Sequence, residues 1–177
     1  KDKLVFTERL VKLQFDVTQK NAINKESQSI NKPIGNKIAT ARLKHEDAIA
    51  VIIGNRDYEG STPDVDFAGN DADAMKSYIL NKLGYRPGNV LDLRDASQAD
   101  LRAMFGTERS HRGRLYDYVR ADDSDVIVFY SGHGVPDPAG KTGYLLPVDA
   151  DPNRAEFTGY PVDVLLKNLS KVPAKSM

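Results

Sequence analysis

Short apolar runs alternate along residues 47–177 with segments whose apolar residues recur at helical spacing. The run 48–53 is unbroken and ends at Gly54, which is typical of a strand buried on both faces of a parallel sheet. Three further runs predict strands: 89–93, 125–130 and 144–146. Recurring apolar positions predict four helices: 70–83, a helix that begins after Ser97, 113–119 and 161–169.

The predicted helices carry boundary signals. Asn70 or Asp71 is placed to cap the first helix, and Gly84 follows its last apolar residue. Ser97 is placed to cap the second helix, and Pro161 falls in the first turn of the last. The residues predicted to face inward from the first three helices are Met75, Tyr78, Ile79, Leu83, Leu101, Met104, Phe105, Leu115, Tyr118 and Val119.

The predicted element order is β-α-β-α-α-β-β-α. Strands that alternate with helices in this way predict an α/β fold with a mostly parallel central sheet, flanking helices and right-handed crossovers. Ligand sites in such sheets lie at the carboxyl ends of the strands. Candidate chemistry is therefore expected just after Ile53, Leu93 and Tyr130.

Residues 1–45 follow a different pattern. Apolar and polar residues alternate over 11–17, which predicts a strand with one buried face, and Leu4 and Phe6 predict a shorter partner strand. Asn, Lys, Ser and Gln dominate 21–37, which predicts a loop or linker. We therefore expect an N-terminal β segment of unknown role over 1–45 and an α/β core over 46–177.

Composition narrows the classes of function. Twenty-five basic and 25 acidic residues give a formal net charge of zero, whereas nucleic-acid-binding proteins usually carry a basic excess. No apolar run reaches the ~18 residues of a membrane helix, so we expect a soluble chain, with the cytoplasm favoured and the compartment itself unknown. Cysteine is absent, which excludes disulfides, thiolate zinc sites and a thiol nucleophile within these residues. The first residue is Lys1 and the last stretch has no capping signal, so we expect both ends to be cut from a longer chain.

The segment after Tyr130 offers the clearest candidate chemistry. Ser131, Gly132, His133 and Gly134 follow the apolar run directly. A histidine held there can exchange a proton near neutral pH, and the Gly134 N–H, which no side chain shields, can face a developing oxyanion. A tight turn with an exposed histidine explains the tetrapeptide equally well.

Asp71 is the second candidate. Placed at the start of the predicted helix 70–83, it is explained by capping and by the helix dipole alone. The functional interpretation is a carboxylate at the same edge of the sheet as His133, where it recognises a cation.

Four segments in order resemble the large-subunit core of caspase-like cysteine peptidases, and among these the prokaryotic metacaspase (orthocaspase) branch. The segments are Ala48-Ile-Ala-Val-Ile-Ile-Gly-Asn, Gly69-Asn-Asp-Ala-Asp-Ala, Asp125-Val-Ile-Val-Phe-Tyr-Ser-Gly-His-Gly and Gly143-Tyr-Leu-Leu-Pro-Val-Asp. The resemblance covers about residues 46–177. It implies a caspase-hemoglobinase α/β sandwich.

The resemblance also implies a Cys–His dyad that hydrolyses peptide bonds. His133 matches the dyad histidine, and the Gly134 N–H matches one oxyanion donor. The family's nucleophilic Cys ends the next strand, which would begin near Ser176 or Met177, so this chain is expected to hold the His half of a site. The expected partners are a protein or peptide substrate and the remainder of the peptidase domain that carries the Cys, with no cofactor, nucleic acid or membrane span.

The resemblance also implies a substrate preference. Caspases that cleave after Asp carry an Arg at the position matching Phe67, whereas metacaspases hold Arg or Lys with carboxylates, which match Asp71 here with Ser131 beside it. Cleavage after Arg or Lys is therefore expected. The acidic cluster of calcium-dependent metacaspases matches Thr142 and 161–163, where only Asp163 is acidic, so no metal site is expected.

Three other interpretations stand against the peptidase. A catalytically inactive caspase-homology module would serve protein–protein interaction. A nucleotide-binding domain is disfavoured, because Gly54-Asn55-Arg56 lacks both phosphate-loop patterns, and a serine hydrolase is disfavoured because no Gly-x-Ser-x-Gly elbow occurs. A Cys within roughly ten following residues, about one strand and its exit turn, would favour the peptidase; Ser, Gly or Ala there would favour the inactive module.

Overall fold

A computed structural model describes residues 45–137 and 143–177, all within one compact unit, Arg42–Met177. The strands predicted over 4–6 and 11–17, the loop over 21–37 and Thr142 lie outside the described residues. The division of the chain at 45/46 stays an expectation.

A parallel sheet forms the centre of the described unit. Strand β1 (Ile49–Gly54) lies between β2 (Val90–Arg94) and β3 (Val126–Ser131) and is parallel to both. β1 is buried along its whole length, as its unbroken apolar run predicted. The register places Gly54 level with Arg94 and with Ser131, so the carboxyl ends of all three strands meet at one edge.

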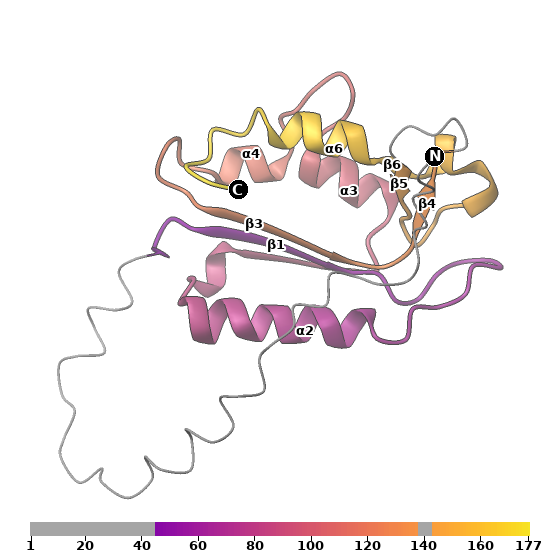
Figure 1. Ribbon diagram of the computed structural model, residues 1–177, viewed down its shortest axis with the longest axis horizontal. Helices are drawn as coiled ribbons and strands as arrows, with labels where there is room; N and C mark the ends of the chain where they lie inside the picture. Colours follow the sequence, from indigo (N-terminus) through magenta and orange to yellow (C-terminus); the bar gives the residue numbers. More distant parts are fainter. Residues whose placement is uncertain (1–44, 138–142) are drawn as a thin grey trace, which may run out of the picture. The chain divides into compact units, whose positions relative to one another are not determined.

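Helices cover both faces of this sheet (Figure 1). Helix α2 (Ala68–Tyr78) lies on one face, while α3 (Gln98–Phe105), α4 (Arg114–Tyr118) and α6 (Val162–Leu169) lie on the other. Side chains of β1 alternate between two buried clusters, because successive strand residues point to opposite faces: Ile49, Val51 and Ile53 pack with the three-helix layer, and Ala50 and Ile52 pack with α2. The predicted α/β sandwich is therefore confirmed.

Helix α2 begins earlier than predicted. Its N-cap is Phe67, without a side-chain capping bond, so the expected cap at Asn70 or Asp71 is wrong. The reason is close packing: a Cβ on Gly54 would lie 2.8 Å from both the Ala68 carbonyl oxygen and the Ala72 Cβ, so the first helical turn lies directly against β1.

The end of this helix was predicted better. A π-helical turn, η3 (Ile79–Leu83), continues α2, and Gly84 ends it with the left-handed φ of 73° that favours glycine. The predicted inward face holds for Met75, Ile79 and Leu83, but Tyr78 is 41% exposed. Tyr118, the last residue of α4, is likewise exposed, whereas Leu115 is buried.

The Ser97 cap is confirmed. Its side chain accepts from the Asp100 N–H, and the Asp100 carboxylate accepts from the Ser97 N–H, which makes a complete capping box at the start of α3. Pro161, by contrast, is the residue before α6 rather than part of its first turn. None of the helices in the described ranges has the length and apolarity needed to cross a membrane.

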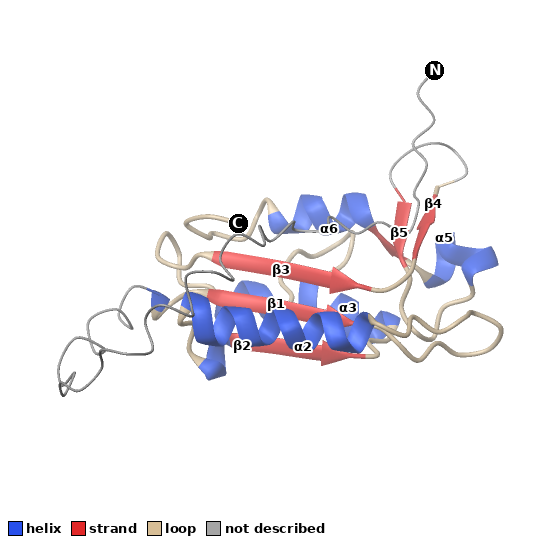
Figure 2. Cartoon of the chain, turned by 60° about the horizontal axis from the view of Figure 1, so that its bottom comes forward, coloured by secondary structure: helices blue, strands red, loops and turns tan. Residues whose placement is uncertain are grey.

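A second, antiparallel sheet was not predicted, although the strand expected over 144–146 overlaps one of its members, β5 (Gly143–Leu145) (Figure 2). The sheet orders β4 (Gly134–Pro136), β5 and β6 (Tyr160–Pro161) beyond the carboxyl edge of the main sheet. The other two strands, β4 and β6, have only three and two residues, which are too few for a periodic signal. The remaining short elements are η4 (Pro87–Asn89), η5 (Pro152–Arg154) and α5 (Ala155–Thr158).

Candidate functional site

The candidate site lies where β3 ends and β4 begins. His133 follows Ser131 by two residues, and its imidazole is partly exposed. Its Nε2 lies 2.8 Å from the carbonyl oxygen of Pro63. A carbonyl oxygen only accepts hydrogen bonds, so Nε2 carries the proton and Nδ1 of the neutral ring keeps its lone pair. The arrangement thus makes Nδ1 the basic atom of this histidine.

Two tyrosines hold the main chain of His133. Its N–H donates to the Tyr58 hydroxyl over 2.8 Å, and its carbonyl accepts from the Tyr130 hydroxyl over 2.8 Å. Gly132 passes between them: an added Cβ would lie 2.8 Å from each hydroxyl. The absence of a side chain at Gly132 therefore lets two protein hydroxyl groups approach the main chain closely.

Gly134 starts β4 and pairs with Leu145 of β5. Because Leu146 N–H donates to the His133 carbonyl over 3.0 Å, the Gly134–Leu145 pair is of the non-hydrogen-bonded kind. The Gly134 N–H therefore points away from β5 and is available to another acceptor. A side chain would fit at Gly134, since the nearest atom to an added Cβ, the Tyr144 carbonyl oxygen, is 3.5 Å away.

Asp71 and Ser131 meet at the same edge. The Ser131 hydroxyl, which belongs to a residue only 1% exposed, donates to Oδ2 of Asp71 over 3.1 Å. Asp71 lies in the first turn of α2 rather than at its cap, so its carboxylate is turned to β3 instead of to the helix N-terminus. Phe67, one turn earlier, is 71% exposed.

Sequence reasoning missed two residues that hold the loops of this edge. Asn55, fully buried, accepts from the Ala96 N–H over 2.9 Å and donates to the Leu146 carbonyl over 3.3 Å. Asp95 accepts from the N–H groups of Arg56 and Asp57 over 2.8 and 3.0 Å. The signal was a polar residue directly after each buried strand, which is where such sheets place their sites.

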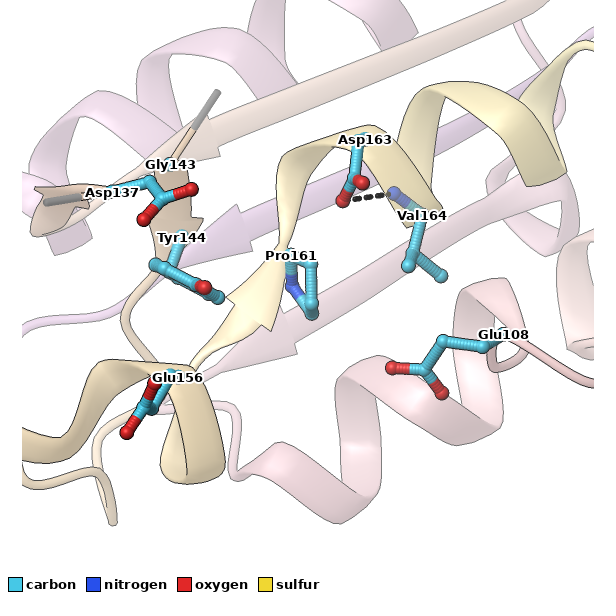
Figure 3. A pocket seen from close by; sticks show the side chains of 8 residues that line it. All are labelled: Glu108, Asp137, Gly143, Tyr144, Glu156, Pro161, Asp163 and Val164. Carbon is cyan, nitrogen blue, oxygen red and sulfur yellow. Dashed lines mark hydrogen bonds between the residues drawn. The ribbon is translucent and has the colours of Figure 1, made fainter. Parts of the chain in front are cut away.

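An acidic pocket lies beside the small sheet (Figure 3). Carboxylates of Glu108, Asp137, Glu156 and Asp163 surround it, with Tyr144, Pro161 and Val164 among the other lining residues. The sequence had pointed to Asp163 alone, through the family resemblance, whereas Glu108, Asp137 and Glu156 come from three other elements or loops. In the described ranges, no three His, Asp or Glu side chains are grouped closely enough to hold a metal ion, and the expected lack of a calcium site stays a prediction.

Comparison with known proteins identifies the family. Residues 47–174 match the sequence profile of the caspase domain. Metacaspase-9 of Arabidopsis thaliana is 27% identical over 97 residues, which are 54% of this chain and 30% of the relative, so the chain spans under a third of that protein. Since the profile match extends over most of the chain and the fold agrees with it, this chain belongs to the caspase domain family of peptidases.

Proposed function

We propose that this chain is part of a cysteine endopeptidase of caspase/metacaspase type that cleaves after Arg or Lys. The observation that carries the proposal is the His133 imidazole at the carboxyl end of β3, with Nε2 committed to the Pro63 carbonyl and Nδ1 left basic. Membership of the caspase family supports hydrolytic chemistry, and the metacaspase relative supports the branch.

The nucleophilic Cys belongs to a segment that follows Ser176. Ser176 bridges to Asp125 in parallel, and its carbonyl accepts from the Val126 N–H over 2.8 Å. A strand that continues in this register beside β3 comes level with Ser131 after about six residues. A Cys at or just beyond that point lies next to His133.

The roles of the groups in the proposed reaction follow from this arrangement. Nδ1 of His133 takes the thiol proton, and the thiolate attacks the substrate carbonyl carbon while the Gly134 N–H donates to the oxyanion. Collapse of this intermediate breaks the C–N bond, and the imidazolium returns its proton to the leaving amine. Water, deprotonated by His133, then hydrolyses the thioester, which releases the acid and restores the thiol.

Specificity comes from Asp71. Its Oδ2 accepts from Ser131, which orients the carboxylate, and a substrate Arg or Lys supplies the compensating charge. Phe67 offers no cation for an acidic substrate residue. A chain extended through the Cys is therefore expected to cleave fluorogenic peptides with Arg or Lys before the scissile bond and to leave the Asp peptide intact.

Two substitutions in that extended protein test the roles. His133→Ala should abolish cleavage without unfolding the domain. Asp71→Ala should lower kcat/KM for Arg peptides at least about tenfold, since a hydrogen bond to a charged group contributes roughly 1.5–3 kcal/mol. Asp73→Ala is the matched control, because Asp73 lies on the same helix but pairs with Arg94 over 2.9 Å.

The outcomes discriminate between functions. Preference for Asp peptides, or an Asp71→Ala variant that retains its Arg preference, contradicts the assigned pocket. Unchanged turnover in His133→Ala contradicts the base. If the natural protein has no Cys after Ser176 and cleaves none of the peptides, the inactive interaction module becomes the better account.

A further inference from the structure

Tyr58 contacts His133 in two ways, although the proposed reaction assigns Tyr58 no role. The tyrosine is 8% exposed and follows β1 by four residues. Its hydroxyl meets the His133 N–H, and its ring lies against the imidazole with 4.8 Å between the ring centroids and a 55° angle between the planes. One side chain therefore touches both the main chain and the ring of the candidate base.

The hydroxyl of Tyr58 replaces a bond of the β4–β5 ladder. The register that pairs Gly134 with Leu145 sets His133 opposite Leu146, and such a pair normally exchanges two main-chain hydrogen bonds. One is present, from Leu146 N–H to the His133 carbonyl over 3.0 Å. The other is relayed: His133 N–H donates to the Tyr58 hydroxyl over 2.8 Å, which donates to the Leu146 carbonyl over 3.2 Å.

The protons of the two tyrosine hydroxyls fit this relay. A hydroxyl has one proton, and the Tyr58 hydroxyl, which accepts from His133, donates its own to the Leu146 carbonyl. The proton of Tyr130 goes to the His133 carbonyl, the nearer of its two acceptors at 2.8 Å against 3.0 Å. Burial raises the pKa of both phenols, so both remain donors across the neutral range.

The same loop supplies the other partner of the imidazole. The Asp64 carboxylate accepts from the Tyr58 N–H over 3.0 Å and closes the segment 58–64, which also contains Pro63. The Pro63 carbonyl accepts from His133 Nε2. Ring packing, main-chain anchoring and the Nε2 bond thus all come from one short closed loop.

We propose that Tyr58 is a positioning residue for His133. The Tyr58 hydroxyl within the β4–β5 ladder and the Tyr58 ring against the imidazole together hold Nε2 of His133 on the Pro63 carbonyl and keep Nδ1 available. The orienting effect is a property of this chain. Its catalytic consequence rests on the proposed function.

The test on the 177-residue chain is Tyr58→Phe, which keeps the ring and removes the hydroxyl. By NMR, hydrogen exchange of the His133 amide should become about five- to thirtyfold faster, the factor expected for one lost buried hydrogen bond. The imidazole ¹⁵N shifts should change from the single Nε2–H tautomer to a mixture. Tyr160→Phe is the matched control: it removes a buried hydroxyl that donates to the Gly106 carbonyl over 3.0 Å, and His133 should be unaffected.

Unchanged exchange and an unchanged tautomer in Tyr58→Phe would overturn the inference, as would an equal effect of Tyr160→Phe. Should Tyr58→Phe fail to fold, Asp64→Ala loosens the same loop from an exposed position and should also speed exchange at the His133 amide; no change there overturns the inference too. In the extended protein, Tyr58→Phe should lower kcat about tenfold with little change in KM. Loss of cleavage in every variant, with the NMR effect intact, would instead count against the proposed function.

Discussion

Asn55→Ala should destabilise the domain by about 2 kcal/mol. The substitution removes bonds to Ala96 N–H, at 2.9 Å, and to the carbonyls of Ala96 and Leu146, at 3.4 and 3.3 Å. Both carbonyls keep other donors: Val148 N–H reaches Ala96 over 3.1 Å, and Tyr58 reaches Leu146. Only the buried Ala96 N–H loses its partner, and one unsatisfied buried group costs about 1–3 kcal/mol.

The assay is urea unfolding followed by circular dichroism, which gives the free energy of unfolding. Asn81→Ala is the control, because its exposed side chain bonds only Ser77 and its loss should cost under about 0.5 kcal/mol. A loss below about 0.5 kcal/mol in Asn55→Ala would refute the accounting of donors and acceptors. A loss above about 4 kcal/mol would mean that the two carbonyls are not satisfied by their remaining donors.

Asn55→Asp separates the donor role from the acceptor role. The new carboxylate still accepts from the Ala96 N–H, but it faces two carbonyl oxygens in a fully buried position. Burial and repulsion raise its folded-state pKa above the ordinary ~3.9. Relative to the unchanged chain, the variant should therefore be least destabilised below about pH 4 and lose stability as the pH rises through that folded-state pKa. A deficit that does not depend on pH would contradict this explanation.

Two further predictions concern packing and acid stability. Gly132→Ala should cost about 1–3 kcal/mol in urea unfolding, because its Cβ would lie 2.8 Å from the hydroxyls of Tyr58 and Tyr130. Gly134→Ala, whose Cβ would have 3.5 Å of room, should cost under about 1 kcal/mol, and equal costs would argue against close packing of the two hydroxyls on Gly132. Burial opposes ionisation of Asp92, but hydrogen bonds from Arg94 and Lys76 outweigh it and hold its pKa below 3.8. The stability that Asp92 contributes should be complete above about pH 4 and disappear as the pH falls through the lowered pKa, so Asp92→Asn should flatten the acid side of a stability–pH curve.

The main sheet and its helices could be read from the sequence because their signals are local. The apolar run 48–53 can only be satisfied by burial on both faces, and Ser97 with Asp100 completes its capping box within four residues. Gly84 ends its helix for the same kind of reason, since only one residue has to adopt a positive φ.

Local signals also located the candidate site at the carboxyl edge of the sheet. The histidine between two glycines lies within four residues, 131–134, directly after an apolar run, so it is recognised without any long-range information. Parallel strands bring their carboxyl ends together, which places these residues at one edge of the sheet. Asp71 was singled out in the same way, either as a cap or as a carboxylate at this edge that recognises a cation. Its actual contact with Ser131 joins residues 60 positions apart, and no local pattern encodes such a pairing.

Tertiary structure alone decided what surrounds the histidine. The Pro63 carbonyl, the Tyr58 hydroxyl and the buried amide of Asn55 all come from the loop between β1 and α2, and their partners, His133 and Ala96, lie far along the chain. Tyr58 and Asn55 there pair main-chain N–H groups that burial would otherwise leave without partners. The start of α2 was likewise set by contact with Gly54 rather than by a capping side chain. Sequence periodicity determines which faces are buried, whereas the partners of buried polar groups depend on which loops the folded sheet brings together.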